Sequence, residues 1–253
     1  SPEKFLLGEV WEDATTKFGF NKRRTYLLGK GLDSVMNYPF KNAVLDFVKG
    51  KPAEQAMTEI LTICEHYPAP AMDTALNFLS THDTERALTV IADEPANGRG
   101  RAWQSGRCVT GDAYEEGLLR LRMAYAIIYT LPGVPCLYYG DEIAMQGYRD
   151  PFNRAFFRWD AHEQRLRPVL AQLRHTCEAF RTGQLRVLRA EDGILHYQRV
   201  GKVETAEIIV NRTEHIIVET LASGKSTEVN PMGFTIVVEE VGHNPNHSYY
   251  DYV

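Results

Sequence analysis

The chain has 253 residues, of which 44% are hydrophobic, 24% charged and 11% aromatic; this composition is that of a folded globular protein and excludes disordered, collagen-like and coiled-coil chains. Lysine and arginine number 28 against 33 aspartates and glutamates, a net charge of −5 without any block of like charge, which excludes nucleic acid as the main partner. The longest apolar stretch, 123–140, is interrupted by Pro132, Gly133 and Pro135 and predicts no membrane-spanning helix.

Short apolar segments in the first 180 or so residues are predicted as strands of a parallel sheet. Each is followed by polar residues, as expected of a strand buried on both faces. These segments are 5–10, 34–38, 75–79 and 134–139. Apolar residues at helical spacing predict helices over 53–66, 114–130 and 168–183, the last with Pro168 in its first turn. The alternation predicts an α/β domain over residues 1–182.

After Gly183 the sequence changes to short alternating or β-branched segments separated by turn residues. Their spacing of about 8 to 12 residues predicts an all-β sandwich domain over 183–253. The segments are 185–190, 194–200, 206–211, 215–220, 225–230 and 233–241. The tail 243–247 is polar and turn-like, and 249–253 is left unassigned. Upstream, the stretch Asp93–Gly111 has no apolar period and is predicted as a functional loop.

The cysteines lie far apart and form no CxxC pair, which argues against a zinc knuckle or a thioredoxin-type site. They are Cys64, Cys108, Cys136 and Cys177. We expect buried free thiols, which favour a cytoplasmic location. The chain opens at Ser1 within an apolar segment and shows no targeting sequence, so the sequence leaves the location open.

Polar residues follow each predicted strand, at the edge where parallel strands carry binding sites. Glu9 and Trp11 end the first strand, and a carboxylate beside an indole suits sugar chemistry, because the ring can stack on a pyranose while the acid protonates a leaving oxygen. Alone, Glu9 could equally be an exposed acid without a role. Asp83 after the third strand and Asp141 after the fourth could equally be helix caps.

Taken in order, the segments at the strand ends resemble the motifs of a known enzyme family. The segments are 8–11 (GEVW), 36–40 (MNYPF), 78–86 (FLSTHDTER), 133–143 (GVPCLYYGDEI) and 147–154 (GYRDPFNR). Together they resemble the alpha-amylase family of glycoside hydrolases, family 13, and within it the group of neopullulanases, cyclomaltodextrinases and maltogenic amylases. The resemblance runs from about Phe5 to the end of the β region.

This resemblance implies roles for individual residues. Glu9 would be the general acid/base, and Asp83 would stabilise the transition state by holding hydroxyls of the reacting sugar ring. The residues implied to bind substrate are His82, Trp11, Tyr148, Asp150 and Arg154. Trp11 would line the aglycone side, and Asp150 and Arg154 would hold glucose units further toward the non-reducing end.

The fold implied by the resemblance is a (β/α)8 TIM barrel followed by an all-β C-terminal sandwich. A whole barrel takes about 250 residues, whereas about 180 precede the predicted sandwich here. The strands found would be strands five to eight, so the chain would be the C-terminal half of the enzyme, and the nucleophilic Asp would lie upstream of Ser1. Because a retaining mechanism needs that nucleophile, we expect the isolated chain to be inactive. A half-barrel leaves open strand edges, so we also expect the chain to form a homodimer.

The expected parent is a retaining hydrolase that cleaves α-1,4 and in some members α-1,6 glucosidic bonds of maltooligosaccharides, cyclodextrins or pullulan. Its partner would be an α-glucan oligosaccharide. We expect no metal site and no cofactor in this chain, with any calcium held by the upstream half of the parent. The alternative is a non-catalytic amylase-like domain for sugar binding or protein interaction, and the presence of Glu9, His82 and Asp83 together favours the enzyme.

Overall fold

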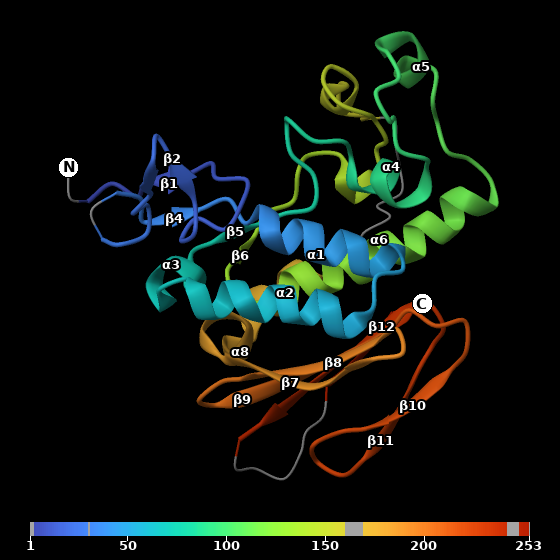
Figure 1. Ribbon diagram of the computed structural model, residues 1–253. Coiled ribbons are helices and arrows are strands. Elements are labelled where there is room, and N and C mark those ends of the chain that lie inside the picture. Colours follow the sequence, from blue (N-terminus) through green and yellow to red (C-terminus); the bar gives the residue numbers. More distant parts are fainter. Residues whose placement is uncertain (1–2, 30, 160–168, 242–247, 253) are drawn as a thin grey trace.

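The computed structural model describes residues 3–29, 31–159, 169–241 and 248–252. Helices and short parallel strands occupy the region up to residue 182, and an antiparallel sheet follows and lies below α1 and α2 in Figure 1. The helices are α1 (Tyr38–Lys49), α2 (Ala53–His66), α3 (Ala69–Asp73), α4 (Ala87–Ala92), α5 (Arg101–Ser105), α6 (Asp112–Thr130), α7 (Val169–Thr176) and α8 (Glu178–Thr182). None of these described helices combines the length and apolar character needed to cross a bilayer.

All four predicted parallel strands are found, but each is two residues long. They are β1 (Leu7–Gly8), β4 (Ser34–Val35), β5 (Leu76–Asn77) and β6 (Val134–Pro135). β1 pairs with β4 and β5 with β6, both in parallel, and a bridge between Met36 and Leu76 joins the two pairs. Burial on both faces is correct for β4 and wrong for β1 and β6, where Leu7 is 40% and Val134 43% exposed. Among the described residues each of these outer strands has a neighbour on one side alone, which leaves its apolar side chains in contact with solvent.

The three predicted helical segments are found, and α1, α3, α4 and α5 were not predicted. α2 has the predicted limits and α6 begins two residues early. Asn37 caps α1 by accepting a hydrogen bond from the Phe40 amide at 3.3 Å. The helix predicted over 168–183 is broken at Cys177, whose backbone is extended, because the Glu178 amide donates to the Glu204 carboxylate. The predicted first-turn residue, Pro168, lies outside the described residues.

The C-terminal region forms an antiparallel sheet with the strand order β13-β12-β9-β8-β7, five strands among the described residues. Its strands are β7 (Gln184–Glu191), β8 (Ile194–Val200), β9 (Glu204–Asn211), β12 (Gly233–Glu240) and β13 (Ser248–Tyr252). A hairpin of β10 (Ile217–Thr220) and β11 (Ser226–Val229) packs on it through a small cluster that includes Ile209, Leu221 and Val237. The segment left unassigned in the sequence supplies β13, and the tail at 243–247 lies outside the described residues.

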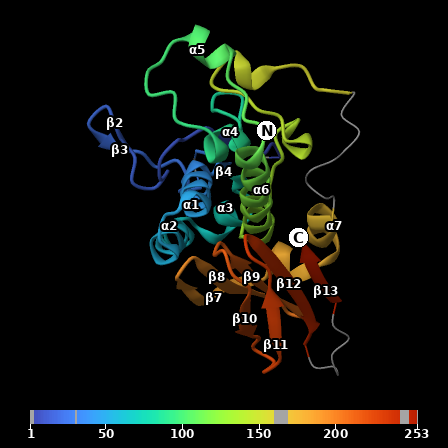
Figure 2. The ribbon, with the colours of Figure 1, turned by 90° about the vertical axis from the view of Figure 1, so that its right-hand side faces the viewer.

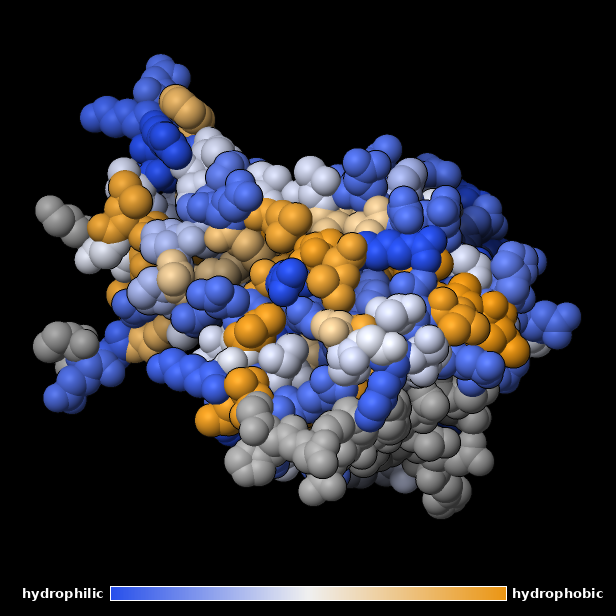
Figure 3. All heavy atoms as spheres, turned by 90° about the horizontal axis from the view of Figure 1, so that it is seen from below, coloured by the Kyte–Doolittle hydropathy of each residue, from blue (hydrophilic) through white to orange (hydrophobic). Residues whose placement is uncertain are grey.

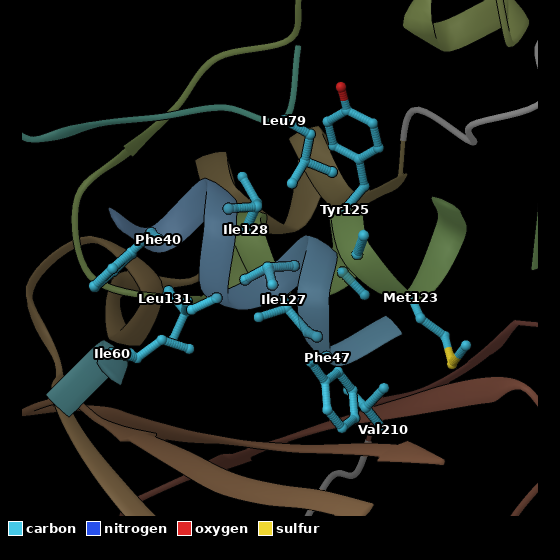
Figure 4. Packing of buried hydrophobic residues seen from close by; sticks show 14 of the residues in the cluster. Phe40, Phe47, Ile60, Leu79, Met123, Tyr125, Ile127, Ile128, Leu131 and Val210 are labelled. Atoms are coloured by element: carbon cyan, nitrogen blue, oxygen red, sulfur yellow. The ribbon is translucent and has the colours of Figure 1, made fainter. Parts of the chain in front are cut away.

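The expected second β layer is therefore reduced to this hairpin, and helices take up the rest of the sheet's packing. One continuous core joins α1, α2 and α6 to the sheet. Figure 4 shows part of it, including Phe47 of α1, Ile60 of α2, Ile127 of α6 and Val210 of β9. Because the sheet is covered on both faces, β8 is buried along nearly its whole length, although His196, Gln198 and Arg199 on it are polar.

Two arginines, Arg199, which is buried, and Arg212, which is half-buried, join the sheet region to helix ends. Arg199 donates to the carbonyl oxygen of Thr130 at the end of α6 and to that of Gly183, each at 2.7 Å. Arg212 of the sheet region donates to the Phe47 carbonyl in the last turn of α1 and, at 2.9 Å, to the Lys51 carbonyl just beyond it. Carbonyls at helix C-termini have no partners within the helix and carry partial negative charge, so cationic donors stabilise them. The sheet thereby fixes the far ends of the two helices that support the candidate site.

Figure 2 shows a small hairpin, β2 (Phe18–Gly19) and β3 (Lys22–Arg23), projecting from the helical region at the left, with α5 at the top of the view. The surface seen from below carries apolar side chains in several separate groups between hydrophilic ones (Figure 3). The cysteines are all free, as predicted, but Cys177 alone is buried and Cys108 is exposed.

Candidate active site

The ends of β1 and β5 bring three of the predicted site residues together. Glu9 directly follows β1, and His82 and Asp83 lie in the turn after β5. One ligand atom from each side chain lies within 4.8 Å of the others. The His82 Nε2 atom is 3.3 Å from Asp83 Oδ2. All three side chains are exposed, so the group forms an open acidic site at the carboxyl ends of parallel strands, the edge at which such sheets bind ligands.

Tyr38, which sequence reasoning missed, holds Glu9. Its hydroxyl donates to Glu9 Oε1 at 2.7 Å, although the tyrosine itself is 1% exposed. Burial and then the hydrogen bond to Glu9 raise the pKa of Tyr38 far above its usual range, so it remains a proton donor. The Trp11 ring stacks on Tyr38 with centroids 4.3 Å apart and keeps 48% of its surface exposed, which leaves an indole surface free beside the carboxylate.

Arg154 joins the predicted residues Asp83 and Asp150 into one network. Its Nη2 atom is 3.0 Å from Asp83 Oδ1, and its Nε atom is 2.9 Å from Asp150 Oδ1. The same Nε donates to the backbone carbonyl of His82 at 2.9 Å. Asp83 thus has a polar partner at each carboxylate oxygen, Arg154 at one and His82 at the other. Six of the seven predicted site residues, with Trp11 attached through Tyr38, therefore belong to one connected group.

Tyr148 is the predicted site residue that the structure does not bring into this group. It is 3% exposed, its hydroxyl donates to the Glu94 carbonyl at 2.6 Å, and its ring lies edge-on to Trp103. Burial and then the hydrogen bond to Asp93 raise its pKa to about 12. It lines a separate cleft of about 590 Å³, formed largely by the predicted loop at 93–111, which contains α5.

A buried ion pair lies beneath the site. Arg86 is fully buried, and its Nη1 atom is 3.1 Å from Oδ1 of Asp141, which is 2% exposed. Tyr125 donates to the other oxygen of Asp141, and the Arg86 guanidinium lies over the rings of Tyr138 and Tyr139. Complete burial raises the pKa of Asp141 despite these partners. Asp141 is thus the first residue of a short 3-10 helix and also half of an internal ion pair, which its sequence neighbourhood did not indicate.

Glu9, His82 and Asp83 are also the donor set that could hold a divalent cation among the described residues. The Arg154 guanidinium, 3.0 Å from Asp83, competes for that carboxylate and places a positive charge beside it. The arrangement therefore favours proton transfer and hydrogen bonding to hydroxyl groups over metal binding.

Comparison with known proteins identifies the group to which this arrangement belongs. The family model described as the alpha amylase catalytic domain matches residues 1–179. A cyclomaltodextrinase from Geobacillus thermopakistaniensis (strain MAS1) is 31% identical over 221 residues, which are 84% of this chain and 32% of that protein. Neopullulanase 2 from Thermoactinomyces vulgaris is 29% identical over 239 residues, 90% of this chain and 35% of that protein.

Among solved structures, a cyclic alpha-maltosyl-(1-->6)-maltose hydrolase from Arthrobacter globiformis aligns with a TM-score of 0.74, covering 95% of this chain and 50% of that one at 23% identity. Together with the family match, this likeness establishes a TIM-barrel-type α/β fold. The chain spans about a third of the length of the two curated relatives above. Since the family model covers well over half of the sequence, the chain belongs to the alpha-amylase family.

Proposed function

We propose that this chain supplies the acid/base and substrate-stabilising part of a retaining α-glucan hydrolase. The observation that carries the proposal is the meeting of Glu9, His82 and Asp83 within 4.8 Å at the ends of two separate strands, beside the half-exposed Trp11. The related proteins are named cyclomaltodextrinase and neopullulanase, which supports maltooligosaccharides, cyclodextrins or pullulan as substrates and α-1,4 or α-1,6 glucosidic bonds as the bonds cleaved.

In the proposed reaction Glu9 acts first as an acid and then as a base. It gives its proton to the glycosidic oxygen as the bond from that oxygen to the anomeric carbon breaks, and a second carboxylate forms a new bond to this carbon. Glu9 then takes a proton from water, whose oxygen displaces that carboxylate. The hydroxyl of Tyr38, 2.7 Å from Oε1, holds one carboxylate oxygen of Glu9, which leaves the other free to face the substrate. The steps use carboxylates and water without a cofactor.

Asp83 is assigned to stabilisation and not to attack. Its distance from Glu9 suits a retaining pair, in which the two carboxyl groups are about 5 to 5.5 Å apart, so distance does not separate the two roles. Its contacts do. Arg154 and His82 each engage one oxygen, which lowers the nucleophilicity of the carboxylate and fixes its orientation. We assign the attacking carboxylate to a segment outside these 253 residues.

The same proposal assigns residues 1–182 to strands five to eight of a (β/α)8 barrel and 183–253 to the C-terminal β domain. The exposed outer strands β1 and β6, with Leu7 and Val134 on them, are then the surfaces that the rest of the barrel would cover. In the isolated chain a second copy takes that place, so the predicted homodimer stays part of this proposal. Light scattering is expected to give twice the chain mass of 28.7 kDa, and a monomer would contradict it.

The test of the proposed function replaces the matching segment of the Geobacillus cyclomaltodextrinase with this chain. We expect the chimera to release glucose and maltose from maltotriose and to open a cyclodextrin, and the isolated chain to do neither. Circular dichroism and gel filtration identify a folded chimera. A folded chimera that does not hydrolyse these substrates would contradict the proposed hydrolase function and leave the sugar-binding alternative. Hydrolysis by the isolated chain would contradict the assignment of the attacking carboxylate to a segment outside it.

A further inference from the structure

The amide of Asn153 holds the turn that carries His82 and Asp83. Asn153 is fully buried, and its Nδ2 atom lies within hydrogen-bond distance of three backbone carbonyl oxygens. The distances are 3.2 Å to Thr81, 2.7 Å to His82 and 2.9 Å to Thr84. The Oδ1 atom of the same side chain has no hydrogen-bond partner among the described residues. All of the hydrogen bonding of this side chain is therefore directed at the turn.

The backbone of Asn153 is itself held in place by Arg86 and by close packing of the loop. Arg86 Nε donates to the Asn153 carbonyl at 2.9 Å, while its Nη1 donates to Asp141 and the guanidinium lies over the rings of two tyrosines. Gly147 lets the loop fold this closely, because a Cβ at that position would lie 2.2 Å from the carbonyl oxygen of Phe152. The position of the amide is thus determined by the buried ion pair and not by solvent or substrate.

We propose that Asn153 is a positioning residue for the site, and this inference rests on the proposed function. It touches no substrate, since it is buried, and acts by fixing the backbone from Thr81 to Thr84. Within that turn the Asp83 amide bonds the Thr81 hydroxyl at 3.2 Å, and the Asp83 carboxylate points toward Glu9 and Arg154. A shift of this turn moves His82 and Asp83 relative to Glu9, and displacement of a reacting group by about 1 Å costs on the order of 10²-fold in rate.

The chain offers a matched control for this role. Asn211 is also fully buried, and its Nδ2 atom contacts the carbonyl oxygens of His215, Val229 and Asn230 at 2.8, 3.1 and 3.0 Å. It lies in the C-terminal sheet, away from the ends of β1 and β5. Removing either amide leaves three carbonyls in need of a donor, and Asn211→Ala also removes the acceptor of the Thr213 amide and hydroxyl, so its loss in fold stability is expected to be at least as large. The difference that bears on the site is the backbone segment that each substitution releases.

The experiment compares Asn153→Ala, Asn153→Ser and Asn211→Ala in the chimera with maltotriose as substrate. For Asn153→Ala we expect kcat to fall about 10²-fold with KM changed far less, because the misplaced turn affects contacts made in the transition state. Asn153→Ser keeps one donor and is expected to recover part of that loss. Asn211→Ala is expected to keep kcat within about twofold, since its segment lies outside the site.

Equal kcat values for Asn153→Ala and Asn211→Ala would overturn the positioning role, as would a rise in KM with kcat unchanged. Glu9→Gln in the same chimera separates the two proposals: if it stays active, the proposed function fails, and if it is inactive while Asn153→Ala is unaffected, this inference fails. If Asn153→Ala does not fold, hydrogen exchange at the Asp83 amide in Asn153→Ser decides. Faster exchange than in the unsubstituted chain is expected, and unchanged exchange contradicts the inference.

Discussion

Replacing Glu9 with glutamine is expected to lower the kcat of the chimera on maltotriose by about 10³-fold, within the range that general acid/base groups contribute. The amide has nearly the shape of the carboxyl group and still accepts the hydrogen bond from Tyr38, so the site keeps its geometry. It cannot donate a proton to the leaving oxygen. The loss is expected to be far smaller for the release of fluoride from α-maltosyl fluoride in the first turnover, because fluoride leaves without protonation and this step needs no acid.

Glu12→Gln is the control for this prediction. Glu12 lies three residues further along the same loop, its side chain is 57% exposed, and it pairs with Lys17 outside the connected group. We expect its kcat to stay within about twofold of the unsubstituted chimera, since an exposed ion pair contributes little. Similar losses in both variants, or a loss for Glu9→Gln that is equal on both substrates, would contradict the acid/base role.

Arg86→Met is expected to lower the free energy of unfolding of the chain by about 3 to 5 kcal/mol, because it leaves a buried carboxylate without its cation. Asp141 is 2% exposed, and the neutral hydroxyls of Tyr125 and Ser80 would remain as its hydrogen-bond donors, without a cation. Urea unfolding measures the change. The matched control is Arg149→Met, which breaks the Glu85 pair of an arginine that is 73% exposed and is expected to cost at most about 1 kcal/mol.

The decrease in the free energy of unfolding caused by Arg86→Met also depends on pH. Burial already holds the pKa of Asp141 above its usual value of 3.8, and removing the cation raises it further. A carboxyl group with a raised pKa in the folded state favours folding when protonated and opposes it when ionised. The deficit is therefore expected to be largest near neutral pH and to shrink as the pH falls through that pKa. A deficit no larger than that of Arg149→Met at neutral pH would contradict the structural role of the pair.

The proximity of Glu9 to His82 and Asp83 could be predicted because parallel strands end at one edge, whatever the length of the chain between them. The roles of these residues stay predictions. Tyr38 could not be found in the same way. Its segment was interpreted as the end of a strand, whereas Tyr38 begins α1, and its bond to Glu9 joins residues 29 positions apart.

The remaining differences also come from contacts that no local pattern contains. The break at Cys177 depends on the carboxylate of Glu204, which is 26 residues from the Glu178 amide that it binds. The family resemblance implied that Tyr148 binds substrate together with Asp150 and Arg154, but its hydroxyl donates to the carbonyl of Glu94, 54 residues upstream. Hydrophobic periodicity predicted most elements correctly because it reports burial, and it failed where a single polar contact decided the backbone.

The most direct test of which carboxylate attacks the sugar is to find the residue that carries the covalent glycosyl group. The Glu9→Gln chimera is incubated with α-maltosyl fluoride, which lets a carboxylate displace fluoride from the anomeric carbon while the missing base slows release of the sugar by water. Peptide mass spectrometry then locates the glycosyl ester. The proposed roles predict the ester on an aspartate of the cyclomaltodextrinase segment, and an ester on Asp83 would contradict them.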